Sequence, residues 1–250
     1  MSDEKALRNY VTFGTAEGAP PKSVTDAFSH HASEVAAVVA TEVHHAYFMI
    51  DHDFADGADS FFAIEGMLVQ CAAELMAADA ILSRGIALLT IFHHARTIYE
   101  AHAVLHWVLQ DWKARAPRLV KDVVVERGKF ESALQKSGWT APTNLTPRAR
   151  ALIGNAAVKQ LPTIDQMIVG SHTLESDYPI QWKYASAHLH PYAIRSAEVD
   201  AQTERFIIEQ ILRGSIRHAC AVYRCVATQY RITEPRALNL LSAAEAWSAG

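Results

Sequence analysis

The stretch from Ile86 to Trp112 constrains the fold more than any other part of the chain. Its residues favour a helix, and the apolar ones lie around the whole helical circumference instead of forming one stripe. We therefore expect a long central helix that protein surrounds on most sides. Arg96 and Glu100 interrupt this apolar helix, and charges placed there must find partners. The same helix also carries four histidines: His93, His94, His102 and His106.

The size and charge of the chain indicate one globular domain without a nucleic-acid surface. With 250 residues, of which 50% are hydrophobic, the chain can bury a substantial core without disulfide or metal staples. Its formal net charge of −4 does not indicate a positively charged surface that would bind the phosphates of nucleic acids. We therefore expect no DNA partner, and RNA only through a local basic site.

The cysteines and the N-terminus favour a soluble protein of the cytoplasm. Cys71, Cys220 and Cys225 are an odd number without a C-x-x-C pair, which argues against a disulfide framework and a thiolate zinc site. The first ten residues carry mixed charge and lack the apolar segment of a signal peptide. Since no apolar run reaches the length of a membrane span, we expect no membrane association.

The pattern along the chain predicts an all-α fold, a single multi-helix bundle with an irregular midsection. Residues 1–22 are expected to form an irregular N-terminal arm and residues 23–250 one helical domain. Pro117 suits the first turn of a helix, and Pro191 follows the end of another. Helices are predicted over 23–50, 60–84, 86–112, 118–135, 148–159, from Pro162 onward, 177–190, 199–230 and 235–247.

Two polar pairs have the spacing that places both members on one helix face. Arg96 and Glu100 are four residues apart, as are Ser186 and His190 on a later helix. One interpretation is a structural ion pair of Arg96 and Glu100, completed by Ser186 and His190, whose disruption costs about 3 to 5 kcal/mol. The other is a functional site formed by the same four residues, because perturbed ionisable groups also mark active sites.

These pairs carry a resemblance to a known family. The segment Ala95–Glu100 reads ARTIYE, Trp107 opens WVL, and the segment from Ser186 to Pro191 reads SAHLHP. In this order, over roughly residues 60 to 230, they resemble the bacterial all-helical domain-of-unknown-function family numbered five-six-seven-seven. That family carries an Arg-Thr-x-x-Glu helix followed by Ser-x-x-x-His. The resemblance implies a helical fold and a bacterial source, and it brings no established reaction.

A second resemblance is to the HEPN ribonucleases, helical bundles that cleave RNA without metal through an Arg-x(4 to 6)-His motif. The segment from Arg96 to His102 is similar to this motif in spacing. The resemblance implies that His102 exchanges a proton with the ribose hydroxyl or the leaving oxygen, while Arg96 stabilises charge on the phosphate. Because the two residues lie roughly 120° apart on the helix, a dimer would have to pair their sites across a two-fold axis.

A metal-dependent enzyme is the third hypothesis, with iron or zinc as the cofactor. Glu42 and His45 have the Glu-x-x-His spacing of di-iron bundles, and His102 and His106 have the spacing of two zinc ligands on one helix face. Glu65 and Glu100 are available as further carboxylates. A second Glu-x-x-His, which the di-iron pattern requires, is absent from the sequence.

Together these patterns favour a cytoplasmic bacterial protein that binds a partner or its own copy through a helical bundle, without a cofactor. We expect a homodimer. The enzymatic alternatives are a HEPN-like ribonuclease, as in toxins or defence effectors, and the metal enzyme. If the protein is an enzyme, the catalytic candidates are Arg96, Glu100, His102, Ser186 and His190.

Overall fold

The computed structural model describes residues 22–50, 58–84, 91–138, 161–188 and 201–249, and every regular element within these ranges is a helix. This confirms the all-α prediction. The arm expected over 1–22, apart from Lys22, and the helix expected over 148–159 lie outside the described residues. The elements are α2 (Lys22–Met49), α3 (Ala58–Arg84), α4 (Ile91–Gln110), α5 (Trp112–Lys136), α7 (Ile164–Met167), α8 (His172–Asp177), the π-helix η3 (Tyr178–Tyr184), α9 (Ala185–His188), α10 (Ala201–Tyr230) and α11 (Pro235–Ala249).

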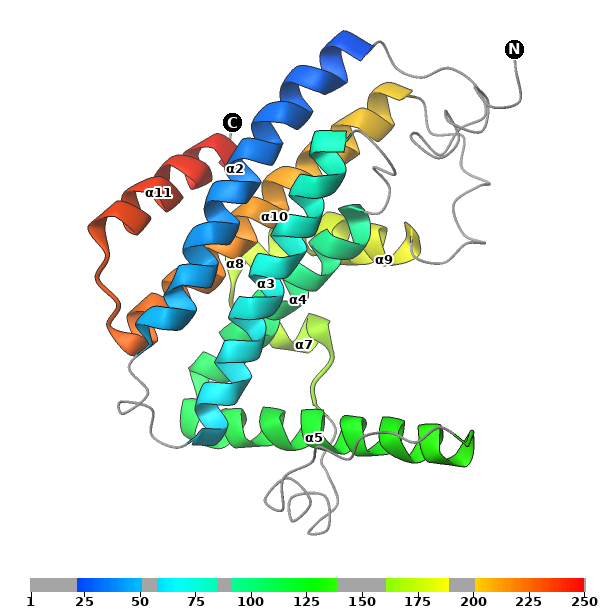
Figure 1. Ribbon diagram of the computed structural model, residues 1–250, viewed down its shortest axis with the longest axis vertical. Coiled ribbons are helices and arrows are strands. Elements are labelled where there is room, and N and C mark those ends of the chain that lie inside the picture. The colour runs from blue at the N-terminus through cyan, green and yellow to red at the C-terminus, as the bar shows by residue number, and fades with distance from the viewer. Residues whose placement is uncertain (1–21, 51–57, 85–90, 139–160, 189–200, 250) are drawn as a thin grey trace.

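Helix α4 is the centre of the arrangement, as its apolar circumference predicts. It contacts α3, α5, α7, η3, α9 and α10. In Figure 1, α2, α3 and α10 follow the long axis of the molecule, α11 lies against one side and α5 crosses one end. The largest fully buried side chains include Phe92, Ile98, Tyr99 and Leu105 of α4 and Tyr223 of α10. The functional candidates of α4 therefore sit inside the bundle or at its border.

Helix α4 ends earlier than expected and α5 begins earlier. The turn at Asp111 separates them, because its Oδ1 accepts a hydrogen bond from the backbone N–H of Ala114 and caps α5. The predicted helix over 118–135 is present within α5, but it begins earlier, at Trp112, so the placement of Pro117 in the first turn is wrong. Pro117 lies inside α5, one residue after Ala116, which is fully buried. Packing of the first turns on the core offsets the hydrogen bond that proline cannot donate.

The helix expected over 177–190 has a different form. Ser171 caps α8, with its hydroxyl accepting from the Leu174 N–H at 3.4 Å, so helical structure begins before Asp177. The chain then widens into the π-helix η3 before α9. Such wide turns are rare and are frequent at functional sites. The last predicted residues of this helix, 189 and 190, lie outside the described part of the chain.

A close contact between η3 and α10 fixes this wide turn in place. Gln181 is 2% exposed, and its Nε2 donates to the carbonyl oxygens of Gln210 at 3.1 Å and Ile211 at 3.2 Å. A Cβ atom on Gly214 would lie 1.8 Å from the Gln181 Nε2. Glycine at this position therefore admits the Gln181 amide onto the backbone of α10.

Across the ranges that the structure describes, no helix combines the length and the hydropathy needed to cross a membrane.

Candidate functional site

Arg96 lies on the border of α4 that faces η3. Its guanidinium Cζ is 4.4 Å from the centre of the Trp182 ring, the geometry of a cation–π contact. The side chain is half-buried, and its Nε is buried without a hydrogen-bond partner among the described residues. Trp182 thus fixes the position of the guanidinium without satisfying its N–H donors.

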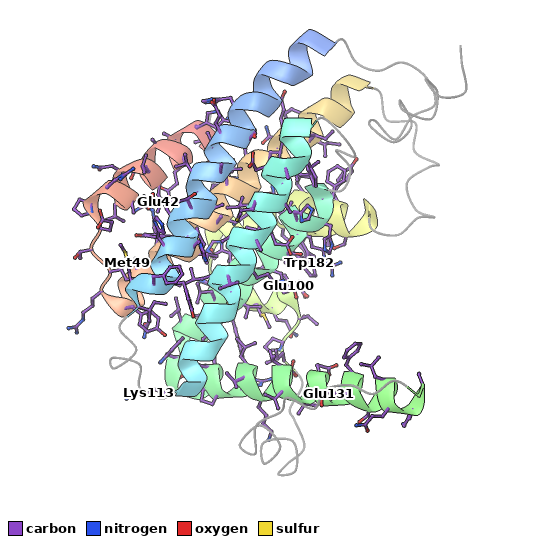
Figure 2. All side chains as sticks on the ribbon, viewed as in Figure 1. Glu42, Met49, Glu100, Lys113, Glu131 and Trp182 are labelled. Atoms are coloured by element: carbon purple, nitrogen blue, oxygen red, sulfur yellow. The ribbon has the colours of Figure 1, made fainter. Side chains whose placement is uncertain are left out.

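Glu100 is one turn further along the same face of α4, and it is also half-buried. Figure 2 labels Glu100 of α4 and Trp182 of η3. In the described part of the chain no ion pair joins Glu100 to Arg96, so the expected ion pair is not formed. The reason is the ring of Trp182, which holds the guanidinium. Burial raises the pKa of Glu100, and the charge of Arg96 acts in the opposite direction.

Ser186 comes to the same border from α9, which packs against α4. Its neighbour Ala185 belongs to the same buried cluster as Ala95 of α4. The hydroxyl oxygen of Ser186 is buried and has no hydrogen-bond partner among the residues described. Arg96 and Glu100 therefore share one face of α4, Ser186 belongs to a helix that packs on α4, and His190 lies outside the described residues.

His102 has different partners, on the side of α4 that faces α10. It is 7% exposed, and its Nδ1 is 2.9 Å from Nδ1 of the fully buried His218. The other nitrogen of His218, Nε2, is 3.1 Å from Oδ2 of Asp177, at the end of α8. Arg217 donates to the same oxygen from Nη2 at 2.6 Å and from Nε at 3.2 Å. We refer to these four residues as the histidine network.

The carboxylate decides where the protons of the histidine network lie. A lone pair on His218 Nε2 would repel Asp177, so this nitrogen carries the proton, although its N–H is not aligned for a hydrogen bond. Nδ1 of His218 then accepts a hydrogen bond from the Nδ1–H group of His102. The remaining nitrogen of His102, Nε2, keeps a free lone pair.

Burial sets the charge states of the histidine network. It lowers the pKa of His102 to about 3, and the nearby His218 acts in the same direction. Burial also lowers the pKa of His218, although Asp177 opposes the shift. For Asp177, burial alone would raise the pKa, but its contacts with His218 and Arg217 outweigh burial and lower it. At neutral pH the network therefore consists of two neutral histidines, a carboxylate and a guanidinium.

Tyr99 joins the Arg96 border to the histidine network. Its ring centre is 4.9 Å from that of His218 and 6.4 Å from that of Trp182, and its hydroxyl donates to the Leu174 carbonyl at 2.7 Å. The sequence interpretation missed Tyr99, Asp177, Trp182 and His218 as site residues. For His218 a signal was present, because it shares the apolar face of α10 with Ile211 and Val222.

The proposed metal ligands are not brought together. Glu42 and His45 lie on α2, where His45 is exposed, and His106 of α4 has the side chain of Gln110 as its neighbour, with 2.9 Å between His106 Nε2 and Gln110 Nε2. Within the described residues, no three or more His, Cys, Asp and Glu side chains are arranged to hold a metal ion. The described residues thus supply no set of ligands for the iron or zinc of the metal hypothesis.

Comparison of the chain with protein-family models, with curated proteins and with solved structures finds no match. The resemblances to the five-six-seven-seven family and to the HEPN ribonucleases therefore stay predictions, as does the homodimer. The structure separates the two residues of the HEPN motif. Arg96 contacts Trp182 of η3, whereas His102 contacts His218 of α10.

Proposed function

We propose that the protein is a helical binding module that recognises an anionic group of its ligand through Arg96. The observation that supports this proposal is the state of the guanidinium, which is half-buried, held on the face of Trp182, and without an ion pair in the described part of the chain. Buried or half-buried arginines are usually paired with an acid. An anion from outside supplies the missing acceptor.

The contact with Trp182 prepares Arg96 for binding. A free arginine side chain loses up to about 2 kcal/mol of rotamer entropy when a ligand immobilises it. Here the indole ring already holds the guanidinium, so less of this entropy remains to be lost on binding. The planar guanidinium presents its donors in a fork that matches a carboxylate or a phosphate.

The histidine network positions the helices that carry Arg96 and Trp182, and we assign it no contact with the ligand. His102 and Tyr99 lie on α4 together with Arg96. The contact of His102 with His218 joins α4 to α10, and the hydrogen bond of Tyr99 to the Leu174 carbonyl joins α4 to α8. The bonds between the two histidines and between Arg217 and Asp177 hold these helices in one register. We propose that this register keeps α4 and η3 at the spacing that the contact of Arg96 with Trp182 requires.

The test compares two arginines that differ in their partners. Arg96 has no hydrogen bond or ion pair among the described residues, whereas Arg224 donates to both carboxylate oxygens of Glu245 at 2.6 and 2.7 Å. A ligand that binds the folded state raises its melting temperature with increasing concentration. We expect acetate or phosphate to raise the melting temperature of wild type and of Arg224→Gln at constant ionic strength. Loss of this rise in Arg96→Gln supports the proposal, and an equal rise in Arg96→Gln refutes it.

A metal-independent ribonuclease is the second candidate, favoured by the free lone pair of His102 Nε2. In that function Arg96 of one copy of the chain binds the phosphate and His102 of a second copy takes the proton of the ribose hydroxyl, because the two residues of one chain face different helices. Incubation of an RNA with the protein in the presence of a chelator tests it. Cleavage that disappears in both Arg96→Ala and His102→Ala supports the enzyme, and an intact RNA with wild type contradicts it.

A further inference from the structure

Glu100, like Arg96, is a half-buried charged side chain without an ion pair among the described residues, and its charge is the opposite one. It is half-buried, and it has neither a hydrogen bond nor an ion pair among the described residues. Residues four apart on a helix have Cβ atoms about 5 to 6 Å apart, a spacing at which Glu and Arg ordinarily pair. The guanidinium of Arg96 instead lies over the ring of Trp182. Two opposite charges thus lie one helical turn apart, and neither forms a hydrogen bond or a close ion pair among the described residues, although the charge of Arg96 acts on Glu100.

We propose that the α4–η3 border binds a small zwitterion of the amino-acid type, with its carboxylate on Arg96 and its ammonium group on Glu100. This inference rests on the proposed function and adds the class of ligand. A carboxylate in a fork of N–H donors and an ammonium on a carboxylate are both charge-assisted hydrogen bonds. One small molecule with both groups satisfies both side chains at once.

The neighbouring charge weakens the binding of the simpler ligands. A ligand with an anion alone would approach Arg96 against the repulsion of Glu100, and a ligand with a cation alone would approach Glu100 against that of Arg96. At half-buried positions such repulsion is screened less than at the surface. The raised pKa of Glu100 is consistent with this picture, since it shows that Arg96 alone does not compensate the burial of the carboxylate.

Ser186 supplies a further hydrogen-bonding group at the same border. Its hydroxyl is buried and lacks a partner among the described residues, and its helix α9 packs on α4 beside η3. A buried hydroxyl without a partner destabilises the folded protein, and a bound ligand that supplies the partner recovers this loss. We assign it a bond to the ligand, as a donor to the carboxylate, because its neighbour Ala185 belongs to the same cluster as Ala95, next to Arg96.

The experiment uses three forms of each probe. The full chain is titrated with a panel of free amino acids, with their N-acetyl derivatives, which keep only the anion, and with their methyl esters, which keep only the cation. The readout is the melting temperature at constant ionic strength, converted to a dissociation constant. We expect at least one free amino acid to bind about tenfold or more tightly than either of its derivatives.

Two variants assign the effect to Glu100. Glu100→Gln keeps the shape of the side chain and is expected to lose about tenfold in affinity for the free amino acid, while its affinity for the N-acetyl derivative stays or rises. Glu74→Gln is the matched control, because Glu74 is also mostly buried but already has His94 as its partner at 2.5 Å. It is expected to bind the amino acid like wild type.

The outcomes separate this inference from the proposed function. If acetate or an N-acetyl derivative binds at Arg96 as tightly as every free amino acid, the zwitterion is refuted and anion recognition stands. The same holds if Glu100→Gln binds the free amino acid like wild type. If no probe in any form changes the melting temperature of wild type, both the inference and the proposed function are refuted.

Discussion

His102 and His218 face each other through their Nδ1 atoms, which are 2.9 Å apart at the junction of α4 and α10. One proton lies between the two rings, and Asp177 decides its position from the far side of His218. The buried pair therefore links two long helices by a contact that depends on the protonation state of both rings.

Removal of the second histidine tests the contribution of this network to stability. His218→Ala leaves Asp177 and His102 without their partner in the core and opens a cavity at a fully buried position. We expect a loss of about 3 to 5 kcal/mol in the free energy of unfolding, measured by urea denaturation. His45→Ala on the exposed face of α2 is the control and should change stability by less than about 0.5 kcal/mol. A small effect of His218→Ala would show that the network is dispensable.

The histidine network also predicts how stability depends on pH. The pKa of His102 is lowered to about 3 in the folded protein, so in acid the unfolded chain binds the proton that the folded protein excludes. Stability is therefore fully present above about pH 6.5 and falls by up to about 1.4 kcal/mol per pH unit as the pH drops below that value. His218 acts in the same direction. Glu100, whose pKa is raised, acts in the opposite direction.

Urea denaturation between pH 7.5 and pH 4.5 measures this dependence. His102→Asn removes one of the two titrating rings, and its stability should fall less steeply toward acid than that of wild type. A wild-type stability that stays constant over this range would contradict the charge states given for the network.

The contact between Gly214 and Gln181 predicts the effect of one added methyl group. In Gly214→Ala the new Cβ would lie 1.8 Å from the Gln181 Nε2, so the amide must leave its two carbonyl acceptors. We expect a loss of about 1 to 3 kcal/mol by urea denaturation. Gly66→Ala, with open space around it on α3, should instead stabilise the protein by about 0.4 to 1 kcal/mol.

A double variant checks that the Gln181 amide is the cause. Gln181→Ala removes the group that the new methyl strikes, so Gly214→Ala should cost much less in that background than alone. Additive losses in the double variant would mean that Gly214 is required for another reason.

Much of the fold follows from local patterns in the sequence. The apolar circumference of α4 predicts its central place, and Pro235 marks the start of α11 where the sequence predicts it. The form of η3 was not predictable, because a π-helix depends on the contact of Gln181 with the backbone of α10, 29 residues away. Local propensity carries no signal for such a tertiary contact.

The sequence predicted which residues of α4 belong to the candidate site, but it did not predict which side chains they contact. Helical spacing placed Arg96 beside Glu100, and the Ser186 motif pointed to the correct neighbouring helix. Spacing could not show that Trp182 takes the guanidinium away from Glu100. It also gave no indication that Asp177 meets His218, since these residues belong to separate helices with no fixed register in the sequence.

The most direct test of the account observes the Nε–H group of Arg96 by NMR while acetate is added at constant ionic strength. Because this donor has no partner in the described part of the chain, its signal should shift to a plateau, whereas that of Arg224, bonded to Glu245, should stay in place. An Arg96 signal that remains fixed, or that moves in parallel with Arg224 without reaching a plateau, would contradict anion recognition at Arg96.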